Sequence, residues 1–264
     1  MNHKKSAFIF LLMIAICSTC VIQAYANDNK QKRPIIYSTP EWAPFNYKNE
    51  NGEPIGLYVE ILKEIFEKEM DIGLDFQTVP WKRAQSNVKE GTADILVTVA
   101  TQSRLEYALI TEAPILELYL FAYTYKDHPK LDEINTISSG IDIKRLNLTP
   151  VTNLGNNWHK INIDDHGVNT HYVPSEKNAF MVLALERADI TIEPLYAGSY
   201  LINQLGLSNQ VVRTSGKFGP IIFHILLSKK SPYSNEIKQI NRAIAKVVKS
   251  SRYQDILKYY EEVH

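Results

Sequence analysis

Apolar and polar residues follow two different periods along this chain, one typical of strands and one typical of helices. An apolar, β-branched run at 34–39 and an alternating run at 74–79 predict strands. Between them, Leu57, Ile61 and Ile65 recur at helical spacing among charged residues, which predicts an amphipathic helix.

The same order of elements continues through the first half of the chain. A helix is predicted at 81–90, where Gly91 ends it. A continuous apolar run at 93–99 has the pattern of a strand that is buried on both faces of a parallel sheet. Strands that alternate with helices predict an α/β fold.

The second half predicts a separate lobe. A strand at 118–125 leads into the polar segment 126–129, which we interpret as the crossing into that lobe. Further elements are predicted as strands at 149–152, 189–192 and 219–228 and as helices at 175–187, 234–249 and 252–262. Because the last strand leads back without a long linker, paired strands would join the lobes as a hinge. We place lobe 1 at 27–122 and 217–264 and lobe 2 at 123–216.

The N-terminus has the pattern of a secretory signal over residues 1–26. Lys4 and Lys5 precede an apolar run at 7–17, and Ala24-Tyr25-Ala26 forms a small-x-small cleavage site. A retained membrane anchor and a lipid-modified cysteine are the alternatives, but the apolar run is much shorter than the roughly 20 residues of a spanning helix. We therefore expect an exported protein that resides in the periplasm.

Charge and cysteine content narrow the possible functions. Twenty-nine Lys and Arg residues balance 29 Asp and Glu residues, which argues against nucleic acid as a partner. Removal of 1–26 takes away two lysines and no acid, so the charge becomes 27 − 29 = −2. It also removes both cysteines, Cys17 and Cys20, so neither a disulfide nor a cysteine-based site is expected in the exported protein.

Polar side chains follow the predicted buried strand at 93–99. Thr98, Thr101 and Arg104 lie where ligands bind in open α/β sheets, beyond the carboxyl ends of the strands. The planar guanidinium of Arg104 suits a carboxylate. The alternative is a surface ion pair of Arg104 with Glu106 or Glu112.

Tryptophans near two of the predicted loops offer flat surfaces for a ligand. Trp42 lies beside Pro44 and Phe45 on the loop after the first strand, and we expect Trp42 to form a wall and Phe45 to plug the core. Trp81 extends the wall in this interpretation, and its alternative role is simply to begin a helix.

The second half of the chain contains candidate residues for binding an anion and others for binding a cation. Asn156 and Asn157 precede a helix, whose first N–H groups attract anions, although a plain N-cap is the alternative. Asp189 and Glu193 flank a strand end, where a carboxylate attracts an ammonium group.

Signatures of enzymes and metal sites are missing from the sequence. It contains no G-x-S-x-G, phosphate loop, H-E-x-x-H or G-x-G-x-x-G pattern. His159, His166 and His171 form the only histidine cluster, and their spacing places no pair on one helical face. We expect no catalytic residue, metal or cofactor.

Several motifs appear in the order seen in one known family. They are Trp42-Ala43-Pro44-Phe45, Asn51-Gly52, Gly56, Trp81, Gly91-x-x-Asp94, Thr101-Gln-Ser-Arg104, Ala188-Asp189 and the closing helix around Tyr253. In this order, over nearly all of 34–262, the chain resembles family 3 solute-binding proteins, the periplasmic receptors of ABC importers for polar amino acids. The resemblance implies a type II periplasmic-binding-protein-like fold with a hinged cleft between its lobes. It also implies a small, carboxylated, amino-acid-like ligand, an inner-membrane ABC permease as partner, and a monomer.

The resemblance also implies roles for individual residues of lobe 1. Trp42 would cover the ligand and Trp81 would form an apolar wall. Thr98, Thr101 and Arg104 match the region that binds the α-carboxylate of the ligand, with Arg104 at its centre.

In lobe 2, Asn156 and Asn157 fall where the family adds to carboxylate binding. Glu193 lies near the position of the family's acid that binds the α-ammonium group, although it follows Asp189 by four residues where the family often has five.

Two other functions remain open. One is a cyclohexadienyl-dehydratase-like enzyme that uses Glu193 or Glu41 as acid or base, and the other is a ligand-sensing partner of a receptor.

Overall fold

The computed structural model describes residues 32–262, and a compact unit begins at Ile35. The predicted signal segment 1–26 lies outside the described residues. Among the residues that are described, no helix combines the length and the apolar character needed to span a membrane.

One mixed sheet forms the centre of this unit, with the strand order β10-β7-β11-β5-β1-β4 and with β6 paired to β11. Its strands are β1 (Ile35–Thr39), β4 (Leu74–Thr78), β5 (Ile95–Thr98), β6 (Ala108–Ile110), β7 (Leu116–Tyr125), β10 (Thr191–Pro194) and β11 (Val211–Ser228). Strand β1 is parallel to β4 and β5, whereas β11 is antiparallel to β5 and β7. Two small sheets pair β2 (Tyr47–Lys48) with β3 (Pro54–Ile55) and β8 (Val151–Asn153) with β9 (His171–Val173).

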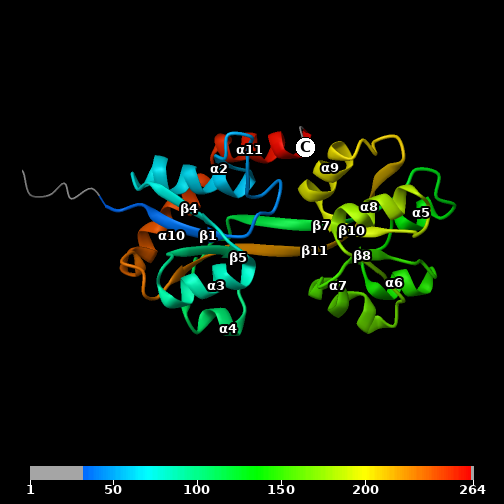
Figure 1. Ribbon diagram of the computed structural model, residues 1–264, viewed down its shortest axis with the longest axis horizontal. Helices are drawn as coiled ribbons and strands as arrows, with labels where there is room; N and C mark the ends of the chain where they lie inside the picture. Colours follow the sequence, from blue (N-terminus) through cyan, green and yellow to red (C-terminus); the bar gives the residue numbers. More distant parts are fainter. Residues whose placement is uncertain (1–31, 263–264) are drawn as a thin grey trace, which may run out of the picture. The chain divides into compact units, whose positions relative to one another are not determined.

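Helices surround the sheet. In the first lobe they are α2 (Leu57–Lys63), its π-helical continuation η1 (Glu64–Glu69), α3 (Trp81–Glu90), α4 (Gln102–Leu105), η3 (Ser234–Glu236), α10 (Ile237–Val247) and α11 (Ser251–Glu262). In the second lobe they are α5 (Leu131–Ile134), α6 (Gly140–Arg145), α7 (Asn157–Asn162), η2 (Asp164–His166), α8 (Glu176–Ala184) and α9 (Leu195–Gln204). Figure 1 shows α2 and α11 on one face of the first-lobe sheet and α3 and α4 on the other. The predicted α/β class is therefore correct.

The position of β5 in the sheet explains why its sequence is apolar without interruption. Ile95 and Val97 pack into the core beneath α2 and α11, whereas Leu96 packs on the opposite face against α3. Because successive strand residues point to opposite faces, a strand covered on both sides needs apolar residues at every position. At the end of α3, Gly91 adopts φ 84° and ends the helix as predicted.

Strands β7 and β11 connect two separate hydrophobic cores, and Figure 1 shows them running side by side between the two groups of elements. On β7, Leu118 packs in the first core and Leu120 in the second. On β11, Ile221 packs against the second core and Phe223 against the first. The chain thus has two lobes joined by paired strands, while the boundaries at 122/123 and 216/217 stay a prediction.

The short elements β6, β9, α4, α5 and α6 were not predicted, and two longer elements also differ from the sequence prediction. Strand β11 begins at Val211, although its apolar run suggested a start at 219, because small and polar residues such as Thr214 and Gly216 occupy its buried positions. Helix α9 was not predicted, since it follows Pro194 directly and contains Gly198, both of which indicate a break in a helical pattern.

Candidate functional site

Two connected cavities lie where the lobes meet. We call the first the acidic pocket; it has a volume of about 310 Å³ and is lined by Trp42, Leu118, Leu120, Asn153, Gly155, Asn156, Asn157, Trp158, Glu176, Ile192, Glu193, Pro194, Ile221 and Phe223. We call the second the basic pocket; it has a volume of about 360 Å³ and is lined by Thr39, Pro40, Trp42, Asn46, Tyr58, Trp81, Val97, Thr98, Val99, Arg104, Trp158, Ile221 and Phe223. The two share Trp42, Trp158, Ile221 and Phe223, so they form one cleft.

The loop after β1 presents Trp42 to both pockets. The backbone N–H of Trp42 donates to the carbonyl of Asn46 at 2.7 Å, which fixes the loop. The ring of Trp42 packs on Phe45 with centroids 4.1 Å apart, and Phe45 is completely buried. Phe45 is therefore part of the core as expected, whereas the role of the half-buried Trp42 as a wall for a ligand stays a prediction.

Arg104 is held in place at the basic pocket. Its Nη1 donates to the carbonyl of Val99 at 2.9 Å, its Nε donates to Oε1 of Gln85 at 3.1 Å, and its guanidinium lies 5.2 Å from the ring centroid of Trp81. Burial lowers the pKa of Arg104 from its ordinary value. Within residues 32–262 it forms no ion pair, so the alternative pairing with Glu106 or Glu112 does not occur there.

The two candidate threonines take different positions. Thr98 ends β5 and lines the basic pocket beside Arg104. Thr101 lines neither pocket; its Oγ1 caps α4 by accepting from the Arg104 backbone N–H at 3.4 Å. Thr101 thus supports the turn that carries Arg104.

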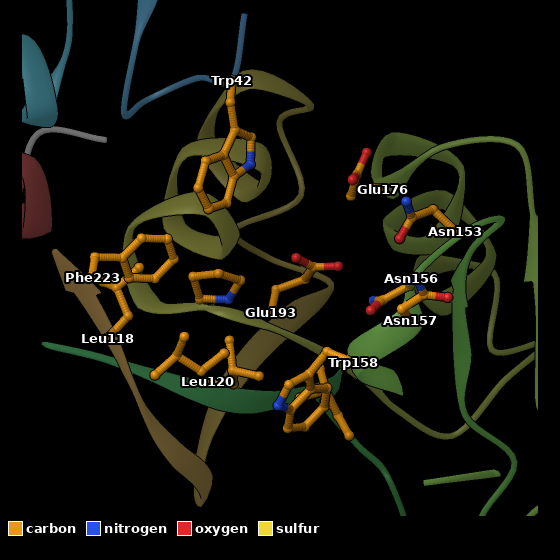
Figure 2. A pocket seen from close by; sticks show the side chains of 14 residues that line it. Trp42, Leu118, Leu120, Asn153, Asn156, Asn157, Trp158, Glu176, Glu193 and Phe223 are labelled. Atoms are coloured by element: carbon orange, nitrogen blue, oxygen red, sulfur yellow. The ribbon is translucent and has the colours of Figure 1, made fainter. Parts of the chain in front are cut away.

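Glu193 lies in β10 with its side chain directed into the acidic pocket (Figure 2). It is 6% exposed, and its Oε1 has no hydrogen-bond partner among the described residues. Burial, and to a smaller extent the charge of Glu176, raise the pKa of the Glu193 carboxyl to about 8. A buried acid without a partner is costly for the fold, which marks Glu193 as a group available to a ligand.

The asparagines at the start of α7 line the same pocket. Asn156 is the N-cap of this helix, because its Oδ1 accepts from the His159 backbone N–H at 3.0 Å, while its Nδ2 donates to Oγ1 of Thr152 at 3.0 Å. The N-cap alternative is therefore confirmed for Asn156. Asn157 is the first residue of α7 and lines the acidic pocket.

Asp189 and His159 have structural roles. Asp189 accepts from the Thr149 backbone N–H at 2.6 Å and lies 3.0 Å from Nε2 of His128. The buried Nε2 of His159 lies 2.9 Å from Oγ1 of Thr170, and burial lowers the pKa of His159 to about 4, which keeps it neutral. The residues described contain no group of three or more potential metal ligands.

Among the cleft residues that sequence reasoning missed are Trp158, Glu176 and Phe223. Trp158 is the second residue of α7, next to the candidate asparagines, and this position in the sequence was its only signal. Glu176 follows the N-cap Ser175 and is ordinary for the first turn of a helix, while Phe223 lies in an apolar run that indicates core. Only the approach of distant segments places them together.

A two-lobe fold with a polar and aromatic cleft is typical of ligand-binding receptors. The chain belongs to the bacterial extracellular solute-binding proteins, family 3, whose pattern it matches over residues 35–262. No curated protein matches the chain at a significant level.

Solved structures share this fold at low sequence identity. A histidine kinase sensor domain with similarity to periplasmic binding proteins has a TM-score of 0.67 at 18% identity, over 89% of this chain and 98% of that chain. An ancestral arginine-binding protein bound to arginine has a TM-score of 0.65 at 20% identity, over 87% and 99%. An ancestral amino-acid-binding protein, a precursor of cyclohexadienyl dehydratase, has a TM-score of 0.64 at 17% identity, over 87% and 96%. The predicted family and two-lobe fold are therefore confirmed.

Proposed function

We propose that this solute-binding protein captures a small, amino-acid-like ligand in the periplasm and delivers it, as a monomer, to an ABC permease in the inner membrane. One observation carries the proposal: a positioned guanidinium, Arg104, and an unpartnered acid, Glu193, line two connected pockets that share aromatic walls. A ligand with a carboxylate and an ammonium group satisfies both. The ancestral neighbour that binds arginine supports the same class of ligand.

Arg104 and Thr98 would bind the carboxylate from lobe 1, with Trp42 and Trp81 as walls. Glu193 would bind the ammonium group from lobe 2, beside Asn156 and Asn157, while Thr101 would act through the turn of Arg104. A ligand that contacts both lobes favours the conformation in which they approach each other, by as much as its affinities for the two conformations differ. Exclusion of water then strengthens these charge-assisted bonds.

Replacement of Arg104 by alanine tests this function. The change removes the only cationic side chain that lines the basic pocket, so ligand affinity should fall by about 2–5 kcal/mol. A thermal-shift screen of amino acids, polyamines and small carboxylates identifies a ligand, and titration calorimetry then compares the variants.

Arg83→Ala is the matched control, because Arg83 is exposed on α3 and lines neither pocket. It should bind like the wild type. If Arg104→Ala binds the ligand as tightly as the wild type, this result would contradict the anchoring role of Arg104.

A dehydratase is the second candidate, because Glu193 with a pKa of about 8 could hold a proton at neutral pH. A dehydratase precursor also shares the fold. Glu41 is exposed and lines neither pocket, which leaves Glu193 without the second acid named for this role. Turnover of prephenate or arogenate that Glu193→Gln abolishes would decide for the enzyme.

A sensing role is the third candidate, since a histidine kinase sensor domain has the same fold. In that case the ligand-bound protein would bind a separate receptor chain. Co-purification with a permease or with a receptor, in the presence of the identified ligand, distinguishes transport from sensing.

A further inference from the structure

Two carboxyl groups, not one, are directed into the acidic pocket. Glu193 comes from β10 and Glu176 from the first turn of α8, and Figure 2 shows both facing the space beside Trp42 and the asparagines. Among the described residues, neither side chain forms a hydrogen bond or an ion pair. They also interact with each other, since the charge of Glu176 disfavours ionisation of Glu193.

The acidic and basic groups that line the cleft are not equal in number. The acidic pocket contains two acids and no lysine, arginine or histidine, and the basic pocket contains one cation, Arg104, and no acid. A ligand with one carboxylate and one ammonium group pairs with Arg104 and Glu193 and leaves Glu176 unpaired. A second positive group on the ligand would pair with Glu176.

The chemistry of the pocket restricts that second group. Oε1 of Glu193 is buried without a donor, so the cation that reaches it must carry N–H bonds, which a quaternary ammonium group lacks. Planar guanidinium groups, and ammonium groups, also bind favourably against the faces of tryptophan rings. Trp42 and Trp158 both line the acidic pocket.

We propose that Glu176 is a specificity-determining residue that, together with Glu193, makes the cleft select a dibasic ligand: one carboxylate and two N–H-bearing cationic groups. This inference rests on the proposed function and adds the class of ligand to it. Glu193 binds the first cation and Glu176 the second, while Arg104 binds the carboxylate.

Pairs of nearly isosteric amino acids test the selection. Citrulline has the shape of arginine but carries a neutral urea group, and glutamine is a neutral counterpart of ornithine. Titration calorimetry on the exported chain should show arginine or ornithine binding at least about ten-fold more tightly than its neutral counterpart.

Glu176→Gln should reduce this preference to about three-fold or less, mainly by weakening the binding of the dibasic member. Glu133→Gln is the matched control: Glu133 is exposed on α5 in the same lobe and lines neither pocket, so the preference should persist. The comparison of arginine with citrulline on the wild type needs no variant, so it holds even if Glu176→Gln fails to fold.

Other outcomes separate the two proposals. Equal affinity for arginine and citrulline overturns the selection for dibasic ligands and leaves an amino-acid receptor in place. Stabilisation by Mg²⁺ or Ca²⁺ alone that Glu176→Gln abolishes assigns the two acids to a metal ion and also overturns the selection. If no amino acid binds at millimolar concentration, both the proposed function and this inference fail.

Discussion

At the scale of single residues, Glu193 shows how a binding group can oppose stability. Its carboxyl is almost completely buried and Oε1 has no partner among the described residues. The titratable groups that face it are Glu176 on α8, which raises the pKa of Glu193, and Tyr123 on β7, on which Glu193 acts in the same direction. Burial and the charge of Glu176 therefore disfavour the ionised form of Glu193 in the unliganded protein.

The first prediction concerns pH and stability. The ordinary pKa of this carboxyl is 4.5, and the fold raises it to about 8. Between these values the unfolded chain releases the proton that the folded chain retains, so rising pH favours unfolding. Between pH 5.5 and 8 this group should cost the unliganded protein on the order of 3 kcal/mol.

Thermal unfolding of the wild type and of Glu193→Gln across this range measures the effect. The wild type should lose stability relative to the variant as the pH rises, because glutamine does not titrate. Parallel curves for the two proteins would contradict the raised pKa of Glu193.

Binding should respond to pH in the opposite direction. A cation pairs with the ionised carboxylate, so affinity should increase from pH 6 to 8 as Glu193 loses its proton. The same residue should thus destabilise the unliganded protein and, in the proposed function, strengthen the binding of a cation.

At the scale of secondary-structure elements, helix α9 depends on a single close contact. Gly198 lies directly over the ring of Tyr123 on β7, and a Cβ atom at this position would overlap the end of that ring. The ring has little room to move: Tyr123 is completely buried, its hydroxyl donates to the carbonyl of Leu195 at 3.2 Å, and it packs against Phe180.

Gly198→Ala therefore tests two opposing effects. Alanine gains up to about 1 kcal/mol of helix propensity over glycine, whereas overpacking of a core costs about 1–3 kcal/mol. Because the contact is so close, we expect the clash to prevail and the free energy of unfolding to fall by about 1–2 kcal/mol, as measured by denaturant unfolding.

The double variant Gly198→Ala with Tyr123→Leu is the control for this mechanism. Since leucine lacks the distal part of the ring, adding alanine in this background should cost less than it does in the wild type. Equal costs in both backgrounds would show that the ring is not the cause.

At the scale of the whole molecule, all three tryptophans of the chain line the cleft. Trp42 lines both pockets, Trp81 lines the basic pocket, and Trp158 is shared by both. Intrinsic tryptophan fluorescence should therefore report on ligand binding without an added label. We expect a saturating ligand to change the emission, and each Trp→Phe variant to reduce the change by its own share.

Titration of the protein with one ligand, followed both by tryptophan fluorescence and by calorimetry, checks this expectation. Both signals should saturate at the same concentration. A ligand that binds by calorimetry and leaves the emission unchanged would place binding away from the cleft.

The sequence alone determined the α/β class, the family resemblance and the positions of most of the longer elements, and it singled out Arg104 and Glu193 as candidates. These features depend on local patterns: an unbroken apolar run for β5, a helical period for α2, Gly91 at the end of α3, and a charged side chain just after a strand. Such patterns extend over a few residues and can be recognised in one dimension.

Only the tertiary structure decided which side chains share the cleft. Glu176 and Phe223 come from distant parts of the chain, and each has an ordinary local context. It also decided that Asn156 uses its side-chain oxygen to cap α7 and that Arg104 forms no ion pair with any residue of 32–262, because alternative partners of similar chemistry differ only in their distance through space. A cavity is formed where packing leaves space between elements, so no local pattern encodes it.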